Sequence, residues 1–393
     1  MTGKIISNYI IILCIWFAAL ANLCFISANQ IALYIIIPFA LCLSIANYGF
    51  ITKNKYQNIL TALIVWIFFS YLWAEYKVAA GNELKQLVGT FAVAYIYTAL
   101  SQNIKRIPYL YITYIILFIG ACIYAKNNIL IDMVSDTDRL SDETLNANTL
   151  AYYLLYVTFA IYELRNLATK RICQKFFSIC FIVIIPITFV VALLTASRQV
   201  LIIQIPLISI LLYLRYIKGR SVISKAIFII LISISAIIAT PYVVETYNNS
   251  FLKVRNELDI GDDSRAILFK DAIDVGNKHF PIGVGPGNYR FYSPDKLFSH
   301  NTYTELYANE GIVGTWLYIW LIALFVKRQW SRYRISHDNQ YLVFLIFGII
   351  YAFDGFFYVF YPHLWLMGMF ILVAGHSETY YKTYTLKRVQ YEN

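Results

Sequence analysis

Between two hydrophobic segments lies a polar window, Phe280-Pro-Ile-Gly-Val-Gly-Pro-Gly-Asn288, followed by Ser299-His-Asn-Thr-Tyr-Thr-Glu305 and Glu310-Gly-Ile-Val-Gly314. The sequence on either side is apolar and typical of helices embedded in lipid. A histidine, an asparagine, two carboxylates and a glycine-rich turn are costly to place at a membrane surface unless they perform chemistry there. If the protein is an enzyme, we therefore expect its active site to include this window.

The composition belongs to the membrane class. Of the 393 residues, 60% are hydrophobic and 14% are charged, whereas soluble domains carry roughly 25% charged residues. Segments of about 20 apolar residues span a bilayer, and we count twelve, centred near residues 18, 41, 66, 92, 116, 158, 185, 208, 233, 316, 349 and 369. The sequence predicts an all-α polytopic membrane protein with about 12 transmembrane helices and one large extracytoplasmic loop.

The distribution of charge predicts the orientation, because basic residues accumulate on the cytoplasmic side of a membrane. Alternating the loops places 20 of the 32 basic residues on one side with only four of the 22 acids. The two sides then carry net charges of +16 and −6, which together give the formal +10 of the chain. We expect a multi-pass protein with both termini cytoplasmic, and the +10 charge indicates this topology rather than nucleic-acid binding.

The chain is predicted to form a single integral membrane domain, 1–393, with two long extracytoplasmic loops. The first loop, 126–148, is acidic, and the second, 245–301, is the largest soluble part. Within the second loop, Asp262-Asp-Ser264 supplies the N-cap of a helix over about 265–277. The broad apolar stripe of this helix favours a position along the membrane interface.

The glycine-rich stretch predicts a tight turn. Pro281 ends the loop helix, and Gly283, Gly285 and Gly287 can adopt positive φ without strain. No Gly-Lys-Ser/Thr follows and no strand precedes the turn, which excludes a nucleotide phosphate loop. We expect Gly285 and Gly287 to lie at the substrate-binding site.

His300 is the strongest candidate for catalysis, because a neutral imidazole can accept a proton from a hydroxyl near pH 7. The alternative is that His300 only caps the following helix. Asn301 and Glu305 lie one helical turn apart and share a face. Glu305 and Glu310 are carboxylates inside a predicted span, which favours a functional role, although a place at a helix start would also suit their charge.

Arg198 interrupts the positive-inside pattern in the shortest outer connection. A guanidinium there can bind a diphosphate headgroup through two parallel hydrogen bonds, or it can extend along the helix to lipid phosphates. Arg265 and Arg139 are further outer-side arginines, and Arg290 is a weaker candidate close after the glycine turn. Asp354, inside the eleventh segment, either pairs with an arginine or lines the interior.

Metal and disulfide chemistry are not expected. All six cysteines lie in or beside hydrophobic segments, none is part of a CxxC pair, and none falls in a long outer loop. His, Cys and Asp residues show no metal-ligand spacing. We therefore predict no metal site and no cofactor.

Four motifs, in order, resemble those of the O-antigen ligase and polymerase superfamily, which are bacterial inner-membrane glycosyltransferases. Arg139 through Asn146-Ala-Asn148 is similar to the family's Arg…Asn-x-Asn entry to a central helix, and Thr195-Ala-Ser-Arg198 to its Ser/Thr-Arg motif. The large-loop signature is matched by Arg265…Pro281-Ile-Gly-Val-Gly-Pro-Gly287 and by His300-Asn301…Glu305…Glu310-Gly-Ile-Val-Gly314. The motifs cover about residues 139–314, and the first five helices match only in hydropathy.

The resemblance implies a glycosyltransferase that needs neither metal nor ATP. The donor would be an oligosaccharide on undecaprenyl diphosphate at the periplasmic face of the inner membrane, and the acceptor a glycan lipid. His300, Arg198 and Arg265 would be catalytic. The substrate-binding residues would be Arg139, Asn148, Gly285, Gly287, Arg290, Asn301, Glu305 and Glu310.

The resemblance leaves the acceptor open. The Ser-His-Asn-Thr-Tyr run and the two long loops favour an O-antigen polymerase over an O-antigen ligase, which would transfer the glycan to lipid A core. Membrane lipids and a chain-length regulator protein are the other expected partners, and no nucleic acid is expected. A transporter of lipid-linked oligosaccharide is a more distant alternative, because the sequence shows no internal repeat of the kind common in transporters.

Overall fold

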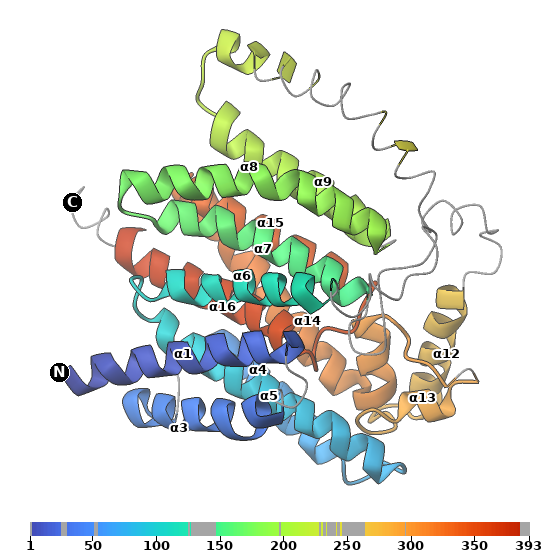
Figure 1. Ribbon diagram of the computed structural model, residues 1–393. Coiled ribbons are helices and arrows are strands. Elements are labelled where there is room, and N and C mark those ends of the chain that lie inside the picture. The colour runs from blue at the N-terminus through green and yellow to red at the C-terminus, as the bar shows by residue number, and fades with distance from the viewer. Residues whose placement is uncertain are drawn as a thin grey trace. The chain divides into compact units, whose positions relative to one another are not determined.

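The computed structural model describes residues 2–24, 30–50, 54–124, 126, 147–195, 198–227, 229–230, 233, 241, 244–245, 264–294 and 296–385. Every regular element within these ranges is a helix (Figure 1), so the predicted all-α class is confirmed. Contacts divide the chain into two compact units. The first comprises Met1–Ala21, Ile26–Leu110 and Asp262–Asn393, and the second Asn22–Phe25 and Tyr111–Gly261.

The first unit contains most of the helices. They are α1 (Thr2–Cys24), η1 (Ala32–Ile36), α3 (Ile37–Tyr48), α4 (Lys55–Ser70), α5 (Lys77–Ser101), α12 (Ser264–Lys278), α13 (Tyr289–Tyr292), α14 (Thr302–Ser336), α15 (Asn339–Asp354), α16 (Leu364–Tyr380) and η5 (Tyr381–Thr385). Helix α6 (Ile107–Tyr124) begins in this unit and continues into the second. Within the first unit α5 packs against α3 and α16, and α14 packs against α4, α12 and α15.

Small side chains bring the helices of the first unit close together. A Cβ atom added to Gly375 of α16 would lie 2.2 Å from Oγ of Ser101 in α5. Small residues at such crossings allow helix backbones to approach in a membrane, where van der Waals packing stabilises the contact. Helix α16 is buried along most of its length.

The second unit is built around α7 (Ala147–Leu167), which packs against α8 (Arg171–Leu194) and α9 (Arg198–Leu212), followed by η3 (Tyr213–Ile217). The amide of Gln204 in α9 donates to the hydroxyl of Thr158 in α7 over 3.1 Å. Nearly all side chains of α7 from Leu150 to Leu164 are buried. A helix that is apolar all round takes such an enclosed position.

Four described helices are long and apolar enough to cross a membrane: Gly3–Asn22, Ile107–Tyr124, Arg171–Thr188 and Thr302–Ser336. Shorter apolar helices cover Ala32–Tyr48, Ile202–Ile217 and Asn339–Asp354. A membrane protein is therefore supported. The expected number of twelve spans, the single-domain organisation and the large loop over 245–301 stay predictions.

The helix predicted for the second loop is α12, and its bounds agree with the predicted 265–277. Its apolar stripe is divided. Leu268, Ala272 and Val275 are buried against the protein, whereas Ile267 is 52% exposed. The buried part of α12 lies beside the first turns of α14 (Figure 1), where Gly276 faces the ring of Tyr307.

Candidate functional site

The glycine-rich turn follows α12 as predicted. Gly283, Gly285 and Gly287 all have positive φ, at 72°, 92° and 62°. The amides of Ile282 and Gly283 donate to the carbonyl of His279, which closes the chain after the helix. The turn thus needs glycine at three alternate positions, because side chains rarely tolerate positive φ.

The turn docks into a break in α14. At Gly311 the helix departs from helical geometry, with φ 64° and ψ −160°. The carbonyls of Ala308 and Asn309 instead accept from the amides of Val284 and Gly285 over 2.9 and 2.8 Å. In return, the amide of Ile312 donates to the carbonyl of Pro281 over 3.0 Å.

This exchange explains how a break is tolerated in a helix of a membrane protein. Backbone groups that leave a helix in lipid must find partners inside the protein, and the turn supplies them. A Cβ atom at Gly311 would lie 2.0 Å from the carbonyl oxygen of Pro281. Only glycine fits where the two backbones meet.

Glu305 and Asn309 connect the first turns of α14 to the window. Glu305 is 2% exposed, and one of its carboxylate oxygens accepts from the amide of Ser299 over 2.7 Å. Its other oxygen accepts from the side-chain amide of Asn309 over 3.3 Å. The side-chain oxygen of Asn309 in turn accepts from the amide of Tyr289 over 2.8 Å. These contacts fix the positions of both ends of the window. Glu305 does lie in the first turn of α14, but it is buried there and not on the surface.

Glu310 lies at the break itself and is fully buried. Its Oε2 accepts from the hydroxyl of Ser70 at the end of α4, and its carbonyl accepts from the indole of Trp66 over 2.9 Å. Its Oε1 is buried without a hydrogen-bond partner. A buried acceptor without a partner is unfavourable, so a bound hydroxyl would stabilise this atom.

Glu83 of α5 is a further carboxylate at the turn, and the sequence reading did not single it out. Its Oε1 accepts from the hydroxyl of Tyr361, and its Oε2 would lie 3.0 Å from a Cβ atom at Gly287. Its charge interacts with Arg290 and with both Glu305 and Glu310. The turn is therefore surrounded by three carboxyl groups and one guanidinium.

Arg290 projects from α13 beside this group of acids. Its guanidinium lies over the rings of Phe291 and Phe298, at 5.0 and 5.5 Å from their centroids. Its Nε is buried without a hydrogen-bond partner. Arginine held by aromatic rings keeps donors for an oxygen-rich ligand.

The start of α5 is tied to the window by Asn288 and by aromatic residues. The side-chain oxygen of Asn288 accepts from the amide of Tyr76 over 2.7 Å. Tyr76 stacks on Phe291 with ring centroids 4.2 Å apart. The hydroxyl of Tyr292 donates to Glu75 over 2.6 Å, and burial together with that carboxylate raises the pKa of Tyr292 to about 12. Tyr292 therefore stays protonated and keeps donating at neutral pH.

His300 is half-buried and adopts a positive φ of 54°. It lies between Ser299 and Asn301, which are both buried and bonded to each other: the Ser299 hydroxyl donates to the Asn301 carbonyl over 3.0 Å. Asn301 is the N-cap of α14, and its side chain accepts from the amides of Tyr303 and Thr304. Asn301 thus performs the capping that was the alternative reading of His300.

The outer-side arginines are described less fully. Arg198 is the first residue of α9, Arg265 the second of α12 and Asn148 the second of α7; their side chains, and all of Arg139, lie outside the described part of the chain. The described candidates Gly285, Gly287, Arg290, His300, Asn301, Glu305 and Glu310 all lie in the first unit, and the bond from the Ser299 amide to Glu305 joins the segment of His300 to the first turn of α14. A meeting of Arg198 with this group stays a prediction.

The arrangement can bind a polar, hydroxyl-bearing molecule next to a broken membrane helix. Carboxylates accept hydrogen bonds from hydroxyls, and Arg290 offers donors. The sequence signal for Glu83 was an acid side chain within a segment predicted to span the membrane, where such groups favour function. Lys85 and Gln86 beside it obscured that signal, because they gave the segment a polar beginning.

Part of the chain is similar to a known family. Residues 181–319 match the family model described as O-antigen ligase. The matched range contains the turn, His300 and the break at Gly311. No match was found among curated proteins. The match over residues 181–319 supports the resemblance to the O-antigen ligase and polymerase superfamily, and with it a ligase- or polymerase-type function.

Proposed function

We propose that this protein is a membrane glycosyltransferase that moves a glycan from undecaprenyl diphosphate to an acceptor glycan lipid at the periplasmic face of the bacterial inner membrane. The observation that supports this most directly is the docking of the turn into the break of α14, inside the family-matched range. The docked turn lies beside Glu83, Glu305, Glu310 and Arg290, and we infer that the lipid-linked sugar binds here together with His300.

In the proposed reaction the acceptor hydroxyl attacks the anomeric carbon of the donor sugar. The bond between that carbon and the diphosphate oxygen breaks, and the electron pair leaves with the diphosphate. His300 accepts the proton of the hydroxyl. The arginines, with Arg198 and Arg265 foremost, stabilise the charge that develops on the leaving diphosphate.

The acidic residues around the turn favour it as the part of the site that binds the acceptor glycan. Glu83, Glu305 and Glu310 outnumber the single guanidinium of Arg290, which is a poor setting for a diphosphate. Hydroxyls, in contrast, are well bound by carboxyl groups in either protonation state. We therefore assign the donor diphosphate to the other arginines.

We favour an O-antigen polymerase, for which the acceptor is a second lipid-linked repeat unit. The alternative is an O-antigen ligase, and the family match over residues 181–319 is compatible with both. Transport of lipid-linked oligosaccharide is the third hypothesis and the least favoured.

Incubation of the purified protein with lipid-linked repeat units, without nucleotide, tests the proposal. We expect longer glycans, and their loss in Arg198→Ala despite normal membrane expression. Unchanged substrate combined with facilitated flipping would overturn the enzyme proposal in favour of transport. A parallel reaction with lipid A core as acceptor distinguishes the ligase from the polymerase.

A further inference from the structure

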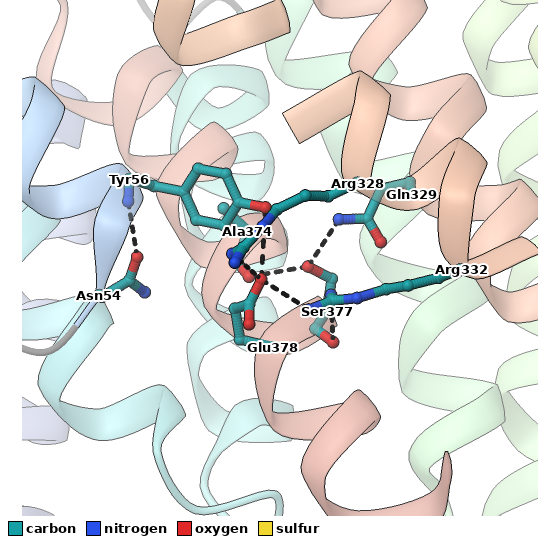
Figure 2. Close-up of polar contacts among 8 residues, drawn as sticks. All are labelled: Asn54, Tyr56, Arg328, Gln329, Arg332, Ala374, Ser377 and Glu378. Atoms are coloured by element: carbon teal, nitrogen blue, oxygen red, sulfur yellow. Dashed lines mark hydrogen bonds and ion pairs between the residues drawn. The ribbon is translucent and has the colours of Figure 1, made fainter. Parts of the chain in front are cut away.

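A second polar group lies at the other end of α14 (Figure 2). There Arg328 and Arg332 both contact the same oxygen, Oε1 of Glu378, at 2.9 Å each. The hydroxyl of Tyr56 in α4 reaches this oxygen over 3.3 Å. From Gly311 to Arg332 the helix rises about 30 Å, roughly the hydrocarbon thickness of a bilayer. This group is therefore remote from the candidate site.

The charge of this group is only partly balanced. Two guanidiniums share one carboxylate, which leaves an excess of one positive charge. Among the described residues, the other acid near this end is Asp338, which caps α15 and accepts from the hydroxyl of Tyr380. Each segment that contributes to this group also carries an exposed lysine nearby in the sequence: Lys55, Lys327 and Lys382.

The two arginines are held in place and yet remain accessible. The guanidinium of Arg332 lies 4.4 Å from the ring centroid of Tyr381 and donates to the carbonyl of Ser377. The guanidinium of Arg328 lies 5.8 Å from that of Tyr56. The side chain of Arg328 is 30% exposed and that of Arg332 is 11% exposed, so both are open to a ligand.

The surroundings correspond to a membrane surface. Trp330 is 50% exposed and Ile335 is 80% exposed on the same turns of α14. Exposed tryptophan together with basic residues at the end of a spanning helix is typical of the headgroup level. The N-terminus of α4, where the side chain of Asn54 accepts from the amide of Tyr56, lies beside the group (Figure 2) and adds positive potential.

We propose that Arg328 and Arg332 form a binding site for the phosphate of an anionic membrane phospholipid. The phosphate supplies the negative charge that Glu378 alone does not, and the exposed Ile335, three residues after Arg332 on the same face of α14, offers an apolar contact beside it. Basic pockets between membrane helices recognise anionic headgroups through this combination of charge and apolar contact.

Thermal unfolding of the purified full chain in neutral detergent, with added phosphatidylglycerol or phosphatidylcholine, tests the site. We expect phosphatidylglycerol alone to raise the midpoint temperature, because a ligand of the native state stabilises it. Arg328→Gln and Arg332→Gln should each weaken the apparent affinity for phosphatidylglycerol about fivefold. Arg334→Gln, which removes an exposed guanidinium from the same helix, is the matched control and should leave this affinity unchanged.

Two further arms separate this site from a purely structural ion pair. Glu378→Gln removes the competing carboxylate, so its stability should depend more strongly on phosphatidylglycerol than that of the wild type. If the substituted proteins lose the same stability in both lipids, the group is a structural ion pair, and the proposal is overturned. Equal stabilisation by inorganic phosphate would show that the site binds a free anion and would overturn the phospholipid proposal. Equal effects of phosphatidylglycerol and phosphatidylcholine on the wild type would also refute the proposal.

Discussion

Gly311→Ala is the sharpest test of how the turn and the broken helix depend on each other. Gly311 holds φ 64° and ψ −160°, a region that only glycine adopts readily. Its missing Cβ would lie 2.0 Å from the carbonyl oxygen of Pro281 and 2.7 Å from the carbonyl carbon of Ile282. Both contacts are with backbone, so no side-chain rotation can relieve them. Alanine must therefore displace the turn or straighten α14.

The magnitude follows from the groups that such a displacement affects. Forcing alanine into this backbone region costs about 1–3 kcal/mol. Displacing the turn also breaks three backbone hydrogen bonds, donated by Val284, Gly285 and Ile312, each of which contributes about 0.5–1.5 kcal/mol. Together these effects predict a destabilisation of roughly 3–7 kcal/mol.

Thermal unfolding in detergent and hydrogen exchange measure the two consequences. We expect a lower midpoint temperature and faster exchange of the amides of Val284, Gly285 and Ile312. Gly219→Ala is the matched control, because Gly219 also has positive φ, 77°, but an added Cβ would meet nothing within 4 Å. If Gly311→Ala loses no more stability than Gly219→Ala and keeps the exchange of 284–285 unchanged, the reasoning is wrong.

Three other substitutions test the remaining contacts of the site. Asn309→Ala should destabilise the protein by about 1–3 kcal/mol, because the buried amide of Tyr289 loses its acceptor; unchanged thermal unfolding would contradict this. Tyr361→Phe should lower stability by a similar amount, because it removes the hydroxyl that donates to Glu83; a stability equal to that of the wild type would show that this bond contributes nothing. His300→Asn keeps a residue that tolerates positive φ, so membrane expression should persist while glycan transfer is lost, and retained transfer would remove His300 from the mechanism.

The local structure of the window could be predicted from sequence because its causes are local. The predicted N-cap in Asp262-Asp-Ser264, a proline at 281 and glycines at alternate positions act within a few residues. The helix Ser264–Lys278 and the positive φ of Gly283, Gly285 and Gly287 therefore agree with prediction.

The break at Gly311 could not be predicted in the same way. Gly-Ile-Val-Gly lies within a long apolar stretch, and a glycine there is as compatible with a continuous helix as with a break. What decides between them is the docked backbone of 281–285, which lies almost 30 residues earlier in the chain. Glu83 and Tyr361 escaped prediction for the same reason, since only tertiary packing brings α5 and the segment before α16 to the turn.

The most direct test of the central claim is glycan transfer by Glu310→Gln under single-turnover conditions. Glutamine keeps the size of the side chain and an oxygen that can accept from Ser70, so the fold should persist, with an unchanged midpoint of thermal unfolding. If the group at the break of α14 binds the acceptor hydroxyl, the rate should fall by up to about tenfold, because an amide nitrogen that cannot accept replaces one carboxyl oxygen and a hydrogen bond of about 0.5–1.5 kcal/mol is lost. A variant that folds normally and transfers glycan at the wild-type rate would show that the reaction takes place elsewhere in the molecule.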